Sequence, residues 1–497
     1  MPTLDFTPRR YHDFDAAKRP SLAEALVPVL ALILFLSVGR VVLSLHSTIP
    51  LLWGIVFAGL MGRYYFGYTW DDLYDGIGQS ILMGLQAVLI LLVIHMLIAA
   101  WTRAGTIPTL MYYGLEFLTP KIFLPFAALL GLLVAFAVGS SWTAAATLGV
   151  AMIGIGEGLG IPAPMTAGAV LSGAYAGDKN SPLSDTSNLS AAVTNTELMT
   201  HVRTMRAGTV VAFGISIVAF VYLGLNAGGA IPAGRVAEMQ SVLTDLYAIT
   251  PLTLLPLLVT FALALRGYPA LPALSAGVFA GVVVSIVLQG VGFAPAWETV
   301  WTGTASPDVA SSLAPAVENV LEQQLLTTAG VSGSMGVISI VVAALTLGGV
   351  LESTGVLATL AHYIGQTVRS VFGLTAGTVA STISMNFLAA DQYIAIVVPG
   401  MTLRNLYDEY DLESRNLSRA LQASGTTTSA FVPWGSGGVF MATTLGVPVL
   451  KYAPFYLFGL INPLVLLVMG ATGWKIFYRD TDDAQATEGW SSVPQAE

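Results

Sequence analysis

The sequence predicts an all-α polytopic membrane protein, and two observations carry that prediction. Of its 497 residues, 55% are hydrophobic and only 10% are charged, whereas soluble domains carry about 25% charged residues. Apolar runs of about 18 residues or more recur between Leu26 and Gly470, and each is long enough to cross a bilayer as a helix. The runs are continuous rather than alternating, which argues against a β-barrel.

The first half divides into apolar segments separated by short polar stretches. The first run lacks a following cleavage site, so we interpret it as a retained span. Two apolar arms joined by the polar tip Gly139–Thr143 predict a re-entrant hairpin. The predicted segments are spans at 21–45, 49–66 and 77–102 with a polar piece at 69–76, hairpin arms at 121–141 and 144–161, a broken span at 164–193, and a span at 206–225.

The second half repeats this order, including a second hairpin and a second broken span. Its predicted segments are spans at 250–266, 270–290 and 333–352, hairpin arms at 372–385 and 393–403 around a tip at 386–392, a span at 415–445 broken at 424–434, and a last span at 454–474.

Three landmarks recur at a nearly constant offset, which indicates an internal duplication. Gly105 matches Gly355 after 250 residues, and the paired hairpin tips and breaks follow at similar spacing. The tips pair as Ser140 with Asn386, and the breaks pair as Gly177 with Gly425. Shared hydropathy alone is the alternative explanation.

If neither hairpin crosses the bilayer, each half crosses an odd number of times, so the second half is inverted. About ten crossing helices, two re-entrant hairpins and two broken helices form the inverted-repeat plan of a secondary transporter. The predicted units are a cytoplasmic tail at 1–20, a first repeat at 21–225, an external linker at 226–249, a second repeat at 250–475 and a cytoplasmic tail at 476–497.

The distribution of positive charge predicts the orientation. With the N-terminus in the cytoplasm, fourteen Lys and Arg residues fall inside and five outside, as expected from the positive-inside rule. We therefore expect a multi-pass protein of the cell (plasma) membrane with both termini cytoplasmic and the acidic loop 292–330 outside.

The stretch 173–189 places ionisable side chains inside an apolar region. Asp178, Lys179 and Asp185 lie there beside Pro182, which removes a backbone donor. Charged groups at membrane depth are costly and indicate function, and broken helices of this kind form cation sites in transporters. A polar surface loop between two spans is the alternative interpretation.

Four polar clusters at membrane depth supply oxygen ligands of the kind that sodium prefers. Single Ser and Thr residues in membrane helices more often bond their own i−4 carbonyl, so the joint pattern is the stronger signal. Lys179 provides charge compensation, although Asp178 or Asp185 could also be its structural partner. The predicted ion-binding residues are Ser140, Ser141, Thr143, Asp178, Asp185, Thr186, Asn188, Asn386, Asp391, Thr426 and Thr428.

Other chemistry has little support in the sequence. The chain has no cysteine, five scattered histidines and no nucleotide-binding motif, so we expect no cofactor and no transition metal. Basic stripes that would bind nucleic acid are absent, and the expected partners are the lipid bilayer and the transported ions. Gly330-Val-Ser-Gly333 with His362 would suit an intramembrane protease, but small residues at the start of a span more commonly pack. We expect no enzyme.

Four motifs resemble the NhaC-type Na+/H+ antiporter family of the ion-transporter superfamily. They are Gly-Ser-Ser-Trp at 139–142, Gly-Asp-Lys-x-Ser-Pro-Leu-Ser-Asp-Thr-x-Asn at 177–188, Ala-Asp-Gln at 390–392 and Ser-Gly-Thr-x-Thr-Ser at 424–429. The resemblance implies cation/proton exchange, paired hairpins and often a homodimer. Some similar proteins exchange sodium-coupled organic acids, such as malate for lactate. Asn180 and Gly435 depart from the family pattern.

We therefore expect a secondary antiporter that exchanges Na+ for H+ by alternating access. Asp178, Asp185 and Asp391 are the residues at which sodium and a proton would compete. The alternative is a Na+-coupled exchanger of small organic acids or amino acids, whose substrate needs a cationic or helix-N-terminal partner. A channel is a further alternative, which the two matched hairpins disfavour.

Overall fold

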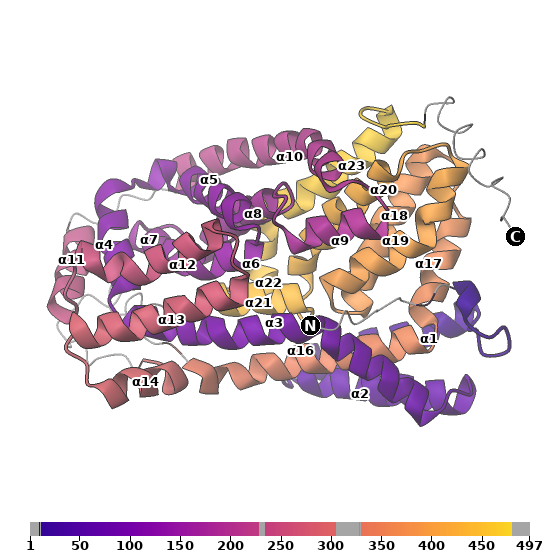
Figure 1. Ribbon diagram of the computed structural model, residues 1–497, viewed down its shortest axis with the longest axis horizontal. Helices are drawn as coiled ribbons and strands as arrows, with labels where there is room; N and C mark the ends of the chain where they lie inside the picture. Colours follow the sequence, from indigo (N-terminus) through magenta and orange to yellow (C-terminus); the bar gives the residue numbers. More distant parts are fainter. Residues whose placement is uncertain (1–8, 10, 228–233, 305–327, 329, 480–497) are drawn as a thin grey trace, which may run out of the picture.

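The computed structural model describes residues 9, 11–227, 234–304, 328 and 330–479, and within these ranges the chain is helical (Figure 1). The described residues contain no β-strand, only an isolated bridge between Leu412 and Tyr478. Seven of the described helices are long and apolar enough to cross a membrane, or up to nine if each bent pair is one span. The predicted all-α polytopic fold is confirmed.

Ten helices form the first half. They are α1 (Leu22–Leu36), α2 (Thr48–Leu60), α3 (Trp70–Arg103), α4 (Thr106–Phe117), α5 (Pro120–Val138), α6 (Ser141–Ala144), α7 (Val150–Gly158), α8 (Ala163–Asp178), α9 (Asp185–Val193) and α10 (Leu198–Ala227). A π-helical turn, Ala145–Gly149, joins α6 to α7 into one arm. The first hairpin and the break after α8 therefore form where the sequence predicts them.

The second half follows the same order after α11, which lies within the predicted linker. Its helices are α11 (Arg235–Leu246), α12 (Leu255–Leu265), α13 (Ala270–Val287), α14 (Phe293–Thr302), α16 (Gly330–Ser353), α17 (Val356–Gln366), α18 (Val371–Leu388), α19 (Gln392–Glu409), α20 (Ser414–Leu421), α21 (Ser436–Leu445), α22 (Val449–Tyr452) and α23 (Leu457–Thr472). The described part of loop 292–330 includes α14, and residues 305–327 and 329 of that loop lie outside the described residues.

The polar piece 69–76 is wrong as a separate connection, because α3 begins at Trp70. The Thr69 side chain accepts a hydrogen bond from the Asp72 amide, and the Asp72 carboxylate accepts one from the Thr69 amide. This reciprocal capping box satisfies amides that the helix itself leaves free. The acidic residues that resemble a loop in the sequence are therefore the first turns of a long helix, where the helix dipole favours negative charge.

The sequence does not predict α4 and α17, because both helices are too short for a span. Each begins directly after a left-handed glycine, Gly105 and Gly355, with φ of 76° in both. Glycine adopts this conformation without a Cβ penalty. The two residues matched in sequence thus occupy the same structural position.

The helix boundaries define the offset between the two repeats more accurately than the hydropathy of the sequence does. Four helices of the first half begin 251 residues before their counterparts. The pairs are α5 with α18, α6 with α19, α8 with α20, and α9 with α21. The tip Ser140 therefore matches Asp391 rather than Asn386, which lies within α18, and the break pairing of Gly177 with Gly425 is likewise shifted. Hydropathy cannot fix this register, because helix caps rather than apolar content decide where each helix begins.

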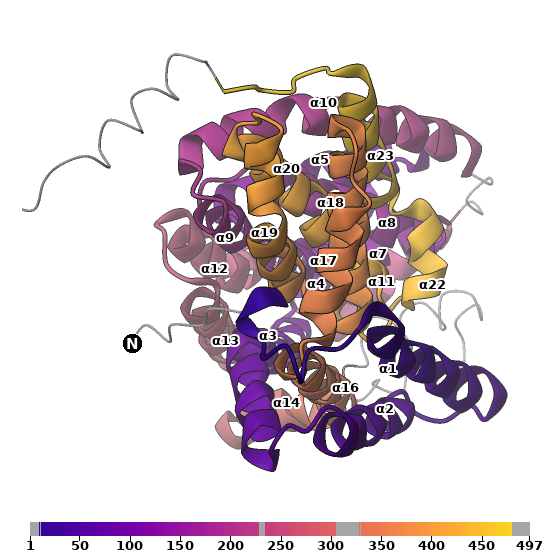
Figure 2. The same ribbon diagram turned by 90° about the vertical axis from the view of Figure 1, so that its right-hand side faces the viewer.

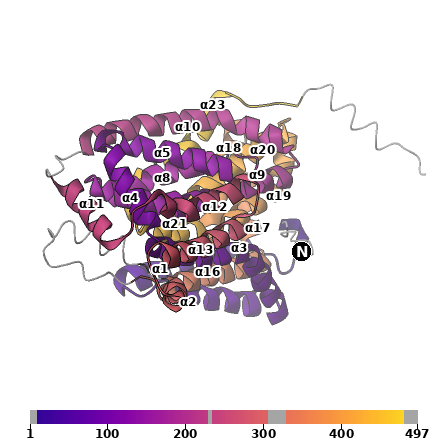
Figure 3. The same ribbon diagram turned by 60° about the vertical axis from the view of Figure 1, so that its left-hand side comes forward.

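The long helices run roughly along one direction, with α10 and α5 on one side and α16, α2 and α1 on the other (Figures 1 and 3). Helices α17 to α20 gather at one end (Figure 2). Helix α8 packs along α5 between these sides. Because Gly173 and Gly177 of α8 lie against the backbone of α5, a Cβ at either would collide with a carbonyl oxygen, of Ala128 or of Leu132. This close packing positions the C-terminus of α8 beside the first hairpin tip.

Candidate functional site

A cavity of about 300 Å³ lies where the two hairpin tips meet the first helix break. Both halves of the chain contribute to its wall, together with the end of α12 and the start of α13. The polar and aromatic residues that line it are Gln86, Ser140, Trp142, Asp178, Asp185, Tyr268, Gln392 and Tyr393. No Lys or Arg is among its lining residues in the described part of the chain.

Each hairpin tip directs the N-terminus of a helix toward the interior. In the first tip, Gly139 ends α5 in a left-handed conformation, and the Ser140 side chain accepts a hydrogen bond of 3.2 Å from the Thr143 amide. In the second tip, Asp391 accepts hydrogen bonds of 2.8 and 3.2 Å from the amides of Tyr393 and Ile394. The two tips thus bring positive helix ends to the cavity.

Asp178 is the last residue of α8, and its side chain is bound to the first tip. One carboxylate oxygen, Oδ2, accepts hydrogen bonds from the Ser141 amide at 3.0 Å and the Ser141 hydroxyl at 2.6 Å. The other oxygen, Oδ1, is buried without a hydrogen-bond partner among the described residues. Asp178 therefore keeps one acceptor available for a cation.

Asp185 begins α9 and lies exposed on the cavity wall. Its Oδ2 accepts a hydrogen bond of 2.6 Å from the Tyr393 hydroxyl, which belongs to the second repeat. Its Oδ1 accepts a hydrogen bond of 2.7 Å from the Thr186 amide. With Asp178 it makes the cavity acidic, and two carboxylates on a wall without a described Lys or Arg favour binding of a positive ligand.

Lys179 lies next in the chain but makes no ion pair at the cavity. Its Nζ donates a hydrogen bond of 2.5 Å to Oδ1 of Asn462 and lies 4.7 Å from the centre of the Phe458 ring. Two ion pairs of the described residues lie elsewhere, between Arg415 and Glu413 and between Arg479 and Asp408. The interpretation of Lys179 as the ion-pair partner of Asp178 or Asp185 is therefore wrong.

Several other predicted ligands lie outside the cavity wall and hold the backbone. Asp391 is the N-cap of α19, and its Oδ2 also accepts a hydrogen bond of 3.2 Å from the Ser436 hydroxyl. Asn188 donates to the carbonyls of Pro182 and Ser184 at 3.1 and 2.7 Å, which fixes the break itself. The hydrogen bonds of Asp391 and Asn188 to neighbouring elements therefore give both side chains a structural role that needs no bound ion.

The second break assembles the remaining predicted residues. Asn386 donates to the Gly425 carbonyl at 2.7 Å and to the Thr428 hydroxyl at 3.0 Å. The Thr428 hydroxyl donates to the carbonyl of Ser424, four residues earlier, as membrane hydroxyls commonly do. Buried oxygens without a hydrogen-bond partner in the described chain remain on Thr143, Asp178, Asn386 and Thr426.

A buried polar chain that the sequence analysis missed joins the two breaks. Gln422, at the second break, accepts a hydrogen bond of 2.5 Å from His201 Nε2 and donates one of 2.7 Å to the Ser187 hydroxyl. The same amide donates to the Thr186 hydroxyl at 3.3 Å, and His201 Nδ1 lies 2.6 Å from the Ser418 hydroxyl. No sequence spacing indicated this link, because its members lie more than 200 residues apart.

The 251-residue offset between the two repeats would have identified Tyr393 as a residue of the site. It occupies the position 251 residues after Trp142, so each hairpin tip places an aromatic side chain on the same cavity. Trp142 stacks on Phe440 with ring centres 4.1 Å apart. Trp142 is therefore a wall residue that also packs.

The motifs, the helix breaks and the cavity agree with comparisons to known proteins. A model of the Na+/H+ antiporter family matches residues 22–186 and 173–474. The arginine/ornithine antiporter ArcD of Halobacterium salinarum is 52% identical over 97% of this chain and 98% of that protein. The Na+/H+ antiporter NhaC of Alkalihalophilus pseudofirmus is 34% identical over 87% of this chain and 91% of that protein. The malate-2H+/Na+-lactate antiporter of Bacillus subtilis is 34% identical over 84% of this chain and 88% of that protein. The chain therefore belongs to the Na+/H+ antiporter family and is a multi-pass membrane transporter whose relatives are antiporters of different substrates.

Proposed function

We propose that this protein exchanges cationic amino acids, with arginine and ornithine as the pair, by alternating access at the acidic cavity. The observation that carries the proposal is the cavity itself, about 300 Å³ in volume and lined by two carboxylates without a Lys or Arg among its described residues. The proposal replaces Na+/H+ exchange as the first choice and retains the amino-acid alternative.

The size of the cavity favours an organic substrate. One water molecule needs about 10–15 Å³ of cavity volume, so the cavity is about 20 to 30 times larger than one water needs. Pockets for small organic molecules start at about 300 Å³. A dehydrated sodium ion fills only a small part of that space.

The chemistry of the wall suits the charges of a basic amino acid. Arginine and ornithine each carry two positive groups and one carboxylate near neutral pH. Asp178 and Asp185 can receive the positive groups, and a guanidinium pairs with a carboxylate through two parallel hydrogen bonds. The aromatic faces of Trp142 and Tyr393 favour a cation further. The α-carboxylate can accept a hydrogen bond from the side-chain amide of Gln392, which lines the cavity.

The same charges explain why transport would be an exchange. An empty cavity leaves carboxylates uncompensated inside the membrane, which is costly. Reorientation is therefore favoured only when a positive substrate is bound. Both amino acids carry a net charge of +1, so a one-for-one exchange moves no net charge and needs neither a sodium nor a proton gradient.

Na+/H+ exchange is the second candidate, and one observation favours it. Thr143, Asp178, Asn386 and Thr426 each keep a buried oxygen without a partner in the described chain, and hard oxygen ligands suit sodium. Two NhaC proteins are 32–34% identical to this chain over most of its length.

Transport by purified protein in liposomes tests the two candidates together. We expect labelled arginine to enter vesicles preloaded with ornithine or arginine, and not to enter unloaded or protein-free vesicles. A sodium gradient should not change that uptake. Sodium-driven proton movement without arginine exchange would contradict the proposal and support the second candidate.

A further inference from the structure

A second and much smaller cavity brings two buried basic side chains together. It has a volume of about 10 Å³ and is lined by Lys179 and Arg419. Its other lining residues are uncharged, and most are apolar, such as Met205 and Leu466. This cavity contains no residue of the acidic cavity wall.

Lys179 is bound in this cavity only by uncharged groups. Its side chain is 1% exposed, and its Nζ makes one hydrogen bond in the described chain, to Asn462 Oδ1. Asn462 is itself fixed, because its amide donates to the Ala423 carbonyl at 2.6 Å. An ammonium group has three donors, so Lys179 has hydrogen-bonding capacity left.

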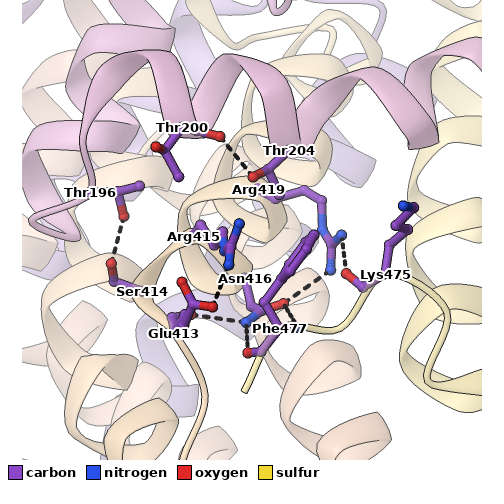
Figure 4. Close-up of polar contacts among 10 residues, drawn as sticks. All are labelled: Thr196, Thr200, Thr204, Glu413, Ser414, Arg415, Asn416, Arg419, Lys475 and Phe477. Atoms are coloured by element: carbon purple, nitrogen blue, oxygen red, sulfur yellow. Dashed lines mark hydrogen bonds and ion pairs between the residues drawn. The ribbon is translucent and has the colours of Figure 1, made fainter. Parts of the chain in front are cut away.

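Arg419 is equally buried and equally without a carboxylate partner. It is 3% exposed, and it donates to the Lys475 carbonyl at 2.8 Å and to Asn416 Oδ1 at 3.4 Å (Figure 4). Its Nε is buried without a hydrogen-bond partner in the described chain. Figure 4 shows that the nearby Glu413 pairs with Arg415 instead.

Two like charges that share a buried cavity are unfavourable unless an anion compensates them. A hydrogen bond from a charged donor to an anion is about twice as strong as one between neutral groups. The cavity volume corresponds to at most one water-sized sphere, so it excludes phosphate, sulfate and an amino-acid carboxylate. A single chloride ion is slightly larger than a water molecule and enters when the flexible lining side chains, such as Met205 and Leu466, move slightly apart. We propose that this cavity is a chloride site, in which Lys179 and Arg419 hold one halide ion.

The site has a consequence for the acidic cavity. Lys179 follows Asp178 in the chain, and an uncompensated ammonium there would weaken cation binding by Asp178. A bound chloride reduces that field, so it would support binding of any cationic substrate. The chloride site itself does not depend on the proposed function.

Thermal unfolding of the full-length protein in detergent tests the site without any transport measurement. Sodium chloride replaces sodium gluconate stepwise at constant ionic strength, and bromide, acetate and sulfate series run in parallel. Because a ligand that binds only the folded state stabilises it in a saturable way, Tm should rise by a few degrees with chloride and bromide. It should stay constant with acetate, sulfate and gluconate.

Variants assign the effect to the cavity. Lys179→Met and Arg419→Gln should each remove the chloride dependence, whereas Arg206→Gln, an exposed charge on α10, should keep it. If either cavity variant fails to fold, 35Cl NMR line broadening of the wild type, competed by bromide, measures binding directly. The proposal is wrong if chloride and gluconate stabilise the protein equally, if acetate acts like chloride, or if both cavity variants keep the dependence.

Discussion

Asp178 and Asp185 differ in how the structure fixes them, and that difference predicts different roles. Asp178 is 3% exposed and held by both donors of Ser141, which belongs to the same repeat. Asp185 is open to the cavity and held across the repeat boundary by Tyr393. We interpret Asp178 as the fixed charge of the site and Asp185 as the charge that adjusts when the two halves move.

Removing the Tyr393 hydroxyl should therefore weaken binding without stopping transport. A hydrogen bond to a charged carboxylate contributes about 1.5–3 kcal/mol, so Tyr393→Phe should raise the KM for arginine about tenfold to a hundredfold. The maximal exchange rate should stay close to that of the wild type. Tyr478→Phe, an exposed tyrosine near the C-terminus, is the control. An unchanged KM would show that the Tyr393 contact does not position Asp185 for substrate.

The buried amide of Gln422 carries a second prediction at this scale. In Gln422→Met the side-chain volume stays similar, but His201 and Ser187 lose their partner. Buried groups left unsatisfied cost about 1–3 kcal/mol each, so thermal stability should fall clearly. Gln366→Met, on the exposed face of α17, should leave Tm nearly unchanged. Equal Tm values for the two variants would contradict the role of Gln422 in connecting the two helix breaks.

Among single residues, the sequence predicted the ionisable groups of the site but not their directions. Asp178 and Asp185 were recognisable because carboxylates in apolar runs are costly. The direction of Lys179 depends on Asn462 and Phe458, which follow almost 300 residues later. No local pattern contains such a contact, so the sequence could not exclude the alternative in which Lys179 pairs with a carboxylate.

At the scale of elements, breaks and hairpins were predictable, whereas short helices and repeat register were not. Gly, Pro and polar residues inside apolar runs indicate a break directly. Helices α4, α14 and α17 have 10 to 12 residues each and cannot span a bilayer, so a search for spans overlooks them. The sequence did not indicate that α3 begins at Trp70, because the acidic first turn of this helix resembles a loop.

The packing of α8 against α5 gives a prediction about these elements. Gly173→Ala adds a methyl group that would collide with the Ala128 carbonyl of α5. Forcing extra volume into a packed contact costs about 1–3 kcal/mol, so the yield of folded protein and Tm should drop. In Gly214→Ala on α10 the new methyl meets no atom within 4 Å, and this variant should fold normally. A normal yield and Tm for Gly173→Ala would contradict the close approach of the two helices.

For the whole molecule, the orientation in the membrane remains a prediction from charge. The chain has no cysteine, so single cysteines report exposure to each side of the membrane. Asp245→Cys in α11 should react with an impermeant reagent from outside, and Glu409→Cys at the end of α19 only from inside; both positions are exposed. Labelling of both from the same side would contradict the inverted arrangement of the two repeats.

The most direct test of the account measures arginine–ornithine exchange by the Asp178→Asn variant. The amide keeps the size of the carboxylate and accepts the Ser141 hydrogen bonds, but it removes the charge that binds the substrate. Vesicles loaded with ornithine should take up labelled arginine through the wild type and through Asp245→Asn, an exposed control on α11. Asp178→Asn should insert and fold, because a neutral amide is cheaper to bury than a carboxylate. We predict that its exchange, normalised to folded protein, is lost, whereas exchange at the wild-type rate would contradict the assignment of this cavity as the transport site.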